Sequence, residues 1–381
     1  MSSDCVEKGD SRIQSVDILK GAAIIGVVVA HLVLIQNTES FSDSSFRIGE
    51  LFYAALPMFF VLSGYFYRSE GFVTGLKNRV LPLVIGLIAG TVILTFVMYV
   101  YLLLLGYDLS GSDLLGDIVQ IIIGKAAFED LDAAAFTGET ILNVYDVSLP
   151  FYFIQIMAVG YLIFLPIADT VLKDWKRVVI TIIVLLAITC SWMELVHMQL
   201  PFYAQMGPVV AAFYLTGAYI GRYNLAEYLE NGYGERRYWL IFILMIVAAV
   251  LCIAFIPTGM NLIDSEFGPN GGYSVFTFYV TTMMCGMVLM YLAAFVSHVK
   301  WVTSILTFIG RESLYIFFLH IFVAKMLVAP FVTIDVKTWV PIESVPLSIL
   351  LAIITIVVIV IAVIAFRKIL ARVHSSNSYE N

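Results

Sequence analysis

Charged residues are scarce in this sequence. Asp, Glu, Lys and Arg together make up 13% of its 381 residues, whereas soluble domains usually carry about 25%. Apolar residues reach 61% of the chain. This balance excludes an ordinary soluble globular domain, and it predicts a chain embedded in the lipid bilayer with no nucleic acid partner.

Cysteine and metal-binding patterns are also rare. The chain has four scattered cysteines, and none has the spacing of a metal site. The alternating ten-residue pattern of a membrane barrel is missing as well, so helices must cross the bilayer. The first apolar run carries Asp17 and Lys20 and lacks a convincing small-residue cleavage site. We therefore expect it to remain as a first span rather than to be removed as a signal peptide.

Long apolar runs are abundant, and each is long enough to cross about 30 Å of hydrocarbon. They lie near residues 16–36, 50–67, 80–106, 149–170, 178–196, 203–221, 238–257, 273–297, 302–329 and 345–366. The sequence therefore predicts an all-α fold, a polytopic bundle of about ten transmembrane helices. Residues 16–366 form one membrane-embedded domain in this prediction, and residues 1–15 and 367–381 are its N- and C-terminal tails.

The distribution of basic residues predicts the orientation of the bundle. If the N-terminus is cytoplasmic, most of the 21 Lys and Arg residues fall in inner segments, and the outer segments hold only Arg47, Lys125 and Lys337. Because inner loops carry the excess of basic residues, we expect both termini in the cytoplasm and a location in the plasma (cytoplasmic) membrane. The acidic segment 107–146 then lies outside, and within it residues 120–128 are predicted to lie along the interface.

The first apolar run holds three ionisable residues, Asp17, Lys20 and His31. Lys20 and His31 are eleven residues apart, close to three helical turns, so they project from nearly the same face about 16 Å apart. Asp17 joins that face one turn below Lys20. Either Asp17 neutralises Lys20 while His31 makes one interhelical hydrogen bond, or a neutral His31 acts as a general base near the membrane midplane.

The ninth run contains a second polar cluster, GRESLYIFFLH at 310–320. Ser313 and His320 are seven residues apart and share a helix face. Arg311 either forms a structural ion pair with the adjacent Glu312 or holds an anionic ligand. His320 has the same two interpretations, a satisfied buried histidine or a functional one.

The second run ends in a third group of candidates. Ser63 lies near its inner end, and Arg68, Lys77 and Arg79 follow closely. Taken singly, these basic residues are what any inner loop shows. Together they would also form a cationic mouth for a phosphate-rich ligand that arrives from the cytoplasm.

Four segments, taken together, resemble the acyltransferase-3 family of multipass membrane O-acyltransferases. They are VDILKGAAIIGVVVAH at 16–31, LPMFFVLSGY at 56–65, LPFYFIQIMAVGYLI at 149–163 and IGRESLYIFFLH at 309–320, in the family's order. The family moves an acyl group, often acetyl, from a cytoplasmic acyl-CoA to a hydroxyl of a cell-surface carbohydrate or lipid-linked precursor. The resemblance therefore implies an acyl-CoA-dependent enzyme with acyl-CoA, a glycan or lipid-linked acceptor and the bilayer as partners, and with no tightly bound cofactor or metal.

The resemblance also implies roles for individual residues. His31 stands at the family's first-span histidine, Lys20 stands where many members have arginine, and residues 151–153 stand where many have tryptophan. The expected catalytic residues are His31 as the general base or as an acyl-histidine nucleophile, Lys20 as a stabiliser of negative charge, and His320 as a support for the base. The expected acyl-CoA or substrate-binding residues are Asp17, Ser63, Arg68, Arg79, Arg311 and Ser313.

A transporter or exporter of a small anionic or saccharide solute is the competing interpretation, since buried His, Lys and Arg would also suit a proton relay or an anion site. Against it, the sequence shows no inverted repeat and no broken helices in matching halves. A third alternative is a catalytically idle module that recruits a partner enzyme, in which His31 would be replaceable.

Overall fold

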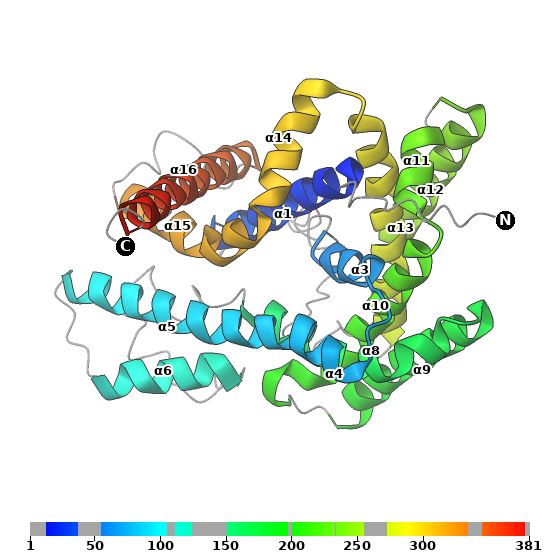
Figure 1. Ribbon diagram of the computed structural model, residues 1–381, viewed down its shortest axis with the longest axis horizontal. Coiled ribbons are helices and arrows are strands. Elements are labelled where there is room, and N and C mark those ends of the chain that lie inside the picture. Colours follow the sequence, from blue (N-terminus) through cyan, green and yellow to red (C-terminus); the bar gives the residue numbers. More distant parts are fainter. Residues whose placement is uncertain are drawn as a thin grey trace.

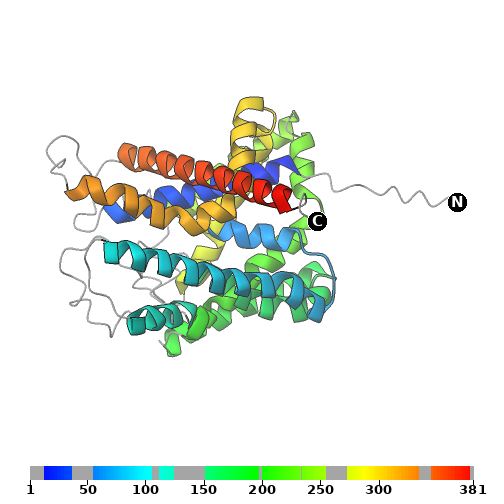
Figure 2. The ribbon, with the colours of Figure 1, turned by 60° about the vertical axis from the view of Figure 1, so that its left-hand side comes forward.

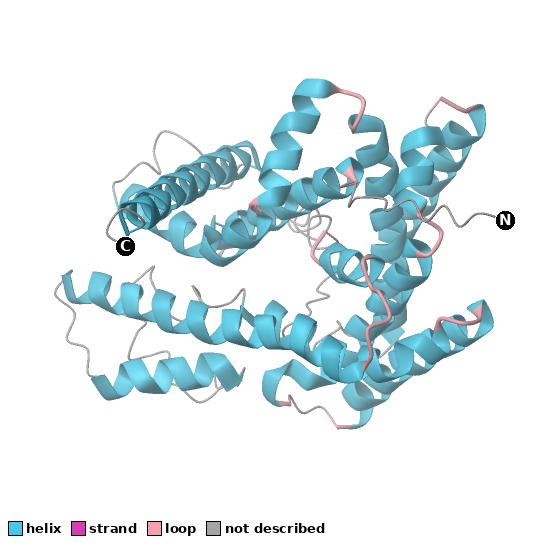
Figure 3. Cartoon of the chain, in the orientation of Figure 1, coloured by secondary structure: helices cyan, strands magenta, loops and turns pink. Residues whose placement is uncertain are grey.

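The computed structural model describes residues 13–36, 55–104, 111–123, 151–196, 200–232, 234–254, 273–333 and 345–377. Every regular element in these ranges is a helix, and none of the described residues forms a strand (Figure 3). The prediction of an all-α fold is therefore confirmed.

Each predicted apolar run contains a helix. In chain order these are α1 (Gln14–Gln36), α3 (Pro57–Tyr65), α5 (Leu81–Leu104), α8 (Phe151–Val171), α9 (Trp175–Leu195), α10 (Gly207–Gly221), α12 (Arg236–Ala254), α13 (Tyr273–Val296), α15 (Ser313–Thr333) and α16 (Val345–Asn377). Shorter elements lie between them: α4 (Phe72–Gly75), the π-helix η1 (Leu76–Val80), α6 (Gly111–Ile123), the 3₁₀ helix η3 (Pro201–Met206), α11 (Leu225–Gly232) and α14 (Lys300–Arg311).

Within the described residues, six helical segments are long and apolar enough to cross a bilayer, or seven if the bent pair α14–α15 counts as one span. The predicted count of about ten is not reached by this measure. One reason is length, because α3 has 9 residues and α10 has 15. The chain is a multi-helix membrane protein, and the number of crossings stays a prediction.

Three boundaries differ from the predictions. The ninth run is not one straight helix, because α14 and α15 meet at Glu312 with a bend of 77°. Helix α16 continues to Asn377, so the predicted C-terminal tail begins inside a helix. Helix α6 ends at Ile123, so it covers only the start of the predicted interfacial segment 120–128, whose remainder lies outside the described residues.

Helix α1 lies in the interior of the group formed by α13, α14, α15 and α16 (Figure 1). It packs against α14, α16, α13 and α15, and 83% of its apolar window is buried, compared with 22% for the window at Phe72–Val97. The ionisable residues of α1 therefore face protein instead of lipid, where an unpaired charge would be costly.

Glycine allows α1 and α14 to cross backbone against backbone. A Cβ atom on Gly310 would lie 2.9 Å from the carbonyl carbon of Asp17 and 3.0 Å from the nitrogen of Gly21. A Cβ atom on Gly21 would in turn meet the backbone of Leu306. Such small-residue crossings are typical of packed membrane helices, and this one fixes α14 across the first turns of α1.

Contacts between helix ends gather many basic residues at one end of the bundle. Asp17, near the start of α1, faces Arg311 at the end of α14, and the guanidinium of Arg222 at the end of α10 donates to the carbonyl of Leu172 just after α8. Figure 2 shows the start of α5 and the end of α16 toward the same side of the molecule. We call this the basic end, and its members include Lys20, Arg68, Lys77, Arg79, Arg177, Arg222, Arg311 and Arg367.

Candidate active site

Two histidines from different helices meet in the protein interior. His31 lies in the second half of α1 and His320 lies in α15, and their ring centroids are 5.1 Å apart with the planes inclined at 44°. Their exposed fractions are 6% and 1%. A buried imidazole pair next to apolar helices is a place where a proton can be taken up and returned without bulk water.

Backbone contacts assign the proton of His320. Its Nδ1 lies 2.7 Å from the carbonyl oxygen of Phe317 and 3.2 Å from that of Ile316. Carbonyl oxygens only accept hydrogen bonds, so Nδ1 carries the proton and Nε2 is the acceptor in the neutral ring. Nε2 is buried and has no hydrogen-bond partner among the described residues. Because an unsatisfied buried acceptor is costly, this nitrogen is suited to receive a hydrogen bond during a reaction.

A chain of contacting aromatic rings ends at His320. Phe153 of α8 stacks on Phe60 of α3 with centroids 4.7 Å apart, and its ring is 5.0 Å from that of Phe317. Phe317 in turn contacts His320 at 6.0 Å. Phe153 is therefore connected to His320 through Phe317.

Lys20 and Asp17 lie at the basic end, away from the histidine pair. The ammonium of Lys20 is 5.5 Å from the ring centroid of Phe66, a cation–π contact. The Nε atom of Arg311 lies 3.8 Å from a carboxylate oxygen of Asp17. Since about 16 Å of helix separates Lys20 from His31, the structure does not bring these two predicted catalytic residues together.

Arg311 and Glu312 have different partners, although they are neighbours. Arg311 faces Asp17 on α1, whereas Glu312 accepts two hydrogen bonds from Arg367 on α16, at 2.7 and 2.9 Å. Of the two interpretations of Arg311, the ion pair with Glu312 is therefore replaced by contacts of both residues to other helices, and the anionic ligand stays a prediction. Ser313 is half-buried and begins α15 directly after the bend.

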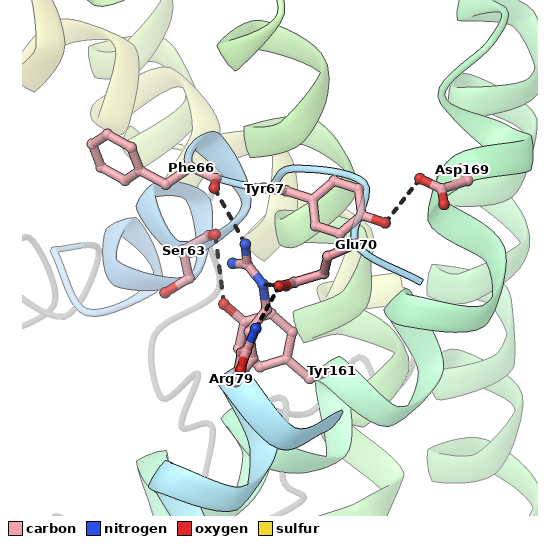
Figure 4. A network of polar contacts seen from close by, with 8 residues as sticks. Ser63, Phe66, Tyr67, Glu70, Arg79, Tyr161 and Asp169 are labelled. Atoms are coloured by element: carbon pink, nitrogen blue, oxygen red, sulfur yellow. Dashed lines mark hydrogen bonds and ion pairs between the residues drawn. The ribbon is translucent and has the colours of Figure 1, made fainter. Parts of the chain in front are cut away.

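Arg79 is held inside a network at the basic end (Figure 4). Its Nε donates to Glu70 at 2.6 Å and one terminal nitrogen donates to the carbonyl oxygen of Phe66 at 3.3 Å. The guanidinium also lies 5.4 Å and 5.9 Å from the ring centroids of Tyr67 and Tyr161. These contacts hold Arg79, which belongs to η1, against the end of α3, the α3–α4 loop and α8.

The same network fixes the loop that joins α3 to α4. Asp169 of α8 accepts hydrogen bonds from Tyr67 at 2.9 Å and from Ser69 at 2.7 Å. Burial and the bond to Asp169 raise the pKa of Tyr67. Hydrogen bonds from Arg79 and Asn78 lower the pKa of Glu70, so this carboxylate stays charged at neutral pH. Sequence reasoning missed Glu70 and Asp169 because each is a single acid just outside a motif, with no second acid beside it to form a pattern.

Ser63 and Arg68 complete the set of predicted residues. Ser63 takes part through its backbone, since its carbonyl oxygen accepts a long hydrogen bond of 3.5 Å from Tyr161. Arg68 lies on the exposed part of the α3–α4 loop. Both therefore belong to the basic end.

Comparison with protein families decides the assignment. A model of the acyltransferase-3 family, described as an acyltransferase domain, matches residues 13–367. The chain belongs to the acyltransferase-3 family. The resemblance read from the four segments is thus confirmed. No curated protein and no solved structure matches the chain.

The matched range of this acyltransferase begins one residue before α1 and ends at Arg367, so it contains both histidines and every named member of the basic end. The predicted residues form two groups within it. His31 and His320 form the interior pair, whereas the other seven lie at the basic end. Among the described residues of this family member, no group of three or more His, Cys, Asp or Glu could hold a metal ion.

Proposed function

We propose that this acyltransferase moves an acyl group, acetyl in the simplest case, from acyl-CoA to a hydroxyl of a cell-surface carbohydrate or lipid-linked precursor. The observation that carries the proposal is the buried contact between His31 and His320. Family membership supports acyl transfer in general. The identity of the donor and the acceptor is part of the proposal.

In the proposed reaction His31 is the general base. It takes the proton of the acceptor hydroxyl while the oxygen attacks the thioester carbonyl, and the C–S bond then breaks. The imidazolium returns the proton to the departing CoA thiolate, so the enzyme ends unchanged. The acceptor nitrogen Nε2 of His320 stabilises the imidazolium while it exists.

The basic end is the proposed entry for acyl-CoA. Lys20, Arg68, Arg79 and Arg311 offer positive charge to the phosphates of the donor. Asp17 orients Arg311, and Ser63 and Ser313 line the path. The distance of about 16 Å between Lys20 and His31 suits a ligand whose phosphates and thioester lie at opposite ends of a long arm. The phosphates then stay near water while the neutral thioester reaches the histidines.

The proposal includes the orientation in the plasma membrane. The helices in the ten runs cross the bilayer with the basic end and both termini in the cytoplasm, as the positive-inside bias favours. Acyl-CoA then enters from the cytoplasm, and the acceptor hydroxyl approaches from the other side. The histidine pair lies between the two.

Acetyl transfer in isolated membranes tests the proposal. With radiolabelled acetyl-CoA, His31→Gln should lower incorporation into glycan or lipid by about 100-fold or more, because glutamine can hydrogen-bond but cannot accept the proton. His298→Gln, a change at an exposed histidine, is the control and should retain activity. Lys20→Arg should be milder than Lys20→Ala, since only arginine keeps the charge.

Mass spectrometry of surface glycans and lipids from cells with and without the protein identifies the acceptor. The expected result is one acetylated species that disappears when the protein is removed or carries His31→Gln. Near-normal acylation by His31→Gln protein at matched expression would exclude the general-base role.

A further inference from the structure

The bend between α14 and α15 is attached to two different helices. At the bend, Arg311 faces Asp17 of α1 and Glu312 faces Arg367 of α16. Figure 1 shows α15 running beside α16 after the bend, with α14 crossing α1 before it. The direction of α15 is therefore set by contacts at its first residues.

The contact between Glu312 and Arg367 is the more restrictive of the two. Both terminal nitrogens of Arg367 donate to Glu312, at 2.7 and 2.9 Å, and this paired geometry fixes orientation as well as distance. The Glu312 side chain is 7% exposed. The guanidinium of Arg367 also lies 5.4 Å from the ring centroid of Tyr315, in the first turn of α15. Arg367 of α16 thus holds α15 at two points, Glu312 and Tyr315. The contact of Arg311 with Asp17 is looser, because the nearest nitrogen and oxygen atoms are 3.8 Å apart.

The imidazole of His320 moves with α15. Its Nδ1 is bonded to carbonyl oxygens of its own helix, those of Ile316 and Phe317. Eight residues separate Glu312 from His320, about 12 Å along the axis. A rotation of about 5° at the bend would therefore shift the imidazole by about 1 Å, a misplacement that can lower a rate about 100-fold.

We propose that Glu312 and Arg367 are positioning residues of the acyl-transfer site, which hold α15 at the angle that brings His320 against His31. Neither residue touches the reacting atoms. The inference rests on the proposed function for its activity test, and a second test below is independent of activity.

Kinetics in membranes with labelled acetyl-CoA test the positioning role. Glu312→Gln and Arg367→Gln should each lower the maximal rate about tenfold or more, because His320 loses its alignment. The apparent KM for acetyl-CoA should stay within about twofold, since ground-state binding is retained. The exchanged pair Glu312→Arg with Arg367→Glu should recover most of the rate. Lys368→Gln, which removes a neighbouring positive charge, is the control and should behave as wild type.

Cross-linking measures the geometry directly. In full-length protein with His31→Cys and His320→Cys, a short bifunctional thiol reagent should join the two positions, and adding Glu312→Gln should reduce the yield. Protein with His31→Cys alone is the control for the natural cysteines. Unchanged cross-linking, or an exchanged pair no more active than the single variants, would overturn the inference. If wild-type protein transfers no acetyl group but cross-linking depends on Glu312, the proposed function fails and the positioning of α15 stands.

Discussion

The crossing of α1 and α14 predicts a large effect for one added methyl group. In Gly310→Ala the new Cβ would lie 2.9 Å from the carbonyl carbon of Asp17 and 3.0 Å from the nitrogen of Gly21. Carbon atoms in contact are ordinarily about 3.5 to 4.0 Å apart. The carbonyl oxygen of Asp17 would lie closer still to the new Cβ than its carbon, so α14 must retreat from α1 by about 1 Å or more. Overpacking of this kind typically costs about 1 to 3 kcal/mol. The displaced segment includes Arg311 and the bend, so the angle of α15 should change as well.

Two measurements follow the effect of Gly310→Ala. Thermal stability in detergent, read by size-exclusion chromatography after heating, should fall. Acetyl transfer in membranes at matched protein should fall by about tenfold or more, because a displacement near 1 Å reaches His320. Gly86→Ala in α5 is the matched control, since no described atom beyond its own stretch of helix lies within 4 Å of its added methyl group. Alanine is also the better helix former by about 1 kcal/mol, so this variant should be unchanged or more stable.

The reasoning would be refuted by a Gly310→Ala protein that matches Gly86→Ala in both stability and activity. That result would mean that α1 and α14 are farther apart in the working protein. A loss of stability with full activity would show that the crossing supports the fold but does not set the angle of α15.

Three further predictions address the basic end and the orientation of the chain. Arg79→Ala should raise the apparent KM for acetyl-CoA more than it lowers the maximal rate, because a positive charge that binds the donor is lost. If steady-state kinetics show an unchanged KM, the role of Arg79 is purely structural. The pKa of Glu70 is lowered from its ordinary 4.5, so its stabilising contribution is present above pH 4.5 and is lost as pH falls through the lowered pKa. The stability difference between wild type and Glu70→Gln should shrink accordingly in melts at decreasing pH, and a constant difference would contradict it. A reporter fused near Gly71 should stay cytoplasmic, and a reporter within 107–146 should lie outside. If protease added outside the cell cleaves the first reporter and spares the second, the predicted orientation is wrong.

Local sequence patterns were sufficient to predict the helices and some of the residues of the candidate site. The apolar runs predicted helices correctly because a bilayer leaves the backbone few alternatives. Lys20 and His31 were correctly predicted to lie on a helix that is buried in protein. An ionisable side chain that faced lipid would be costly, so an apolar run that contains two of them must face other helices. These inferences need only the residues within one helix.

Contacts between helices could not be predicted in the same way. His31 and His320 are both visible as intramembrane histidines, but their meeting depends on the angle at which α15 leaves the bend. That bend had a sequence signal, because Gly310 is followed by two charged residues in the middle of an otherwise apolar run. The partners of those charges, Asp17 and Arg367, lie at opposite ends of the matched range and give no pattern by themselves.

The separation of charge from the histidine pair has a physical reason. Positive side chains in the interior would have to be paired and would be costly to bury, and the structure keeps Lys20 and Arg311 at the basic end instead. The histidine pair lies next to an aromatic wall, in which Phe317 contacts His320 and Phe153 and Phe60 stack behind Phe317. Such surroundings suit a neutral thioester and a neutral hydroxyl, and charge then appears there only during the reaction. On the proposed function, the ligand itself connects the two regions, because its phosphates bind at the basic end while its acyl group reaches the aromatic wall. The size of that wall, rather than the basic residues, would then determine which acyl groups are accepted.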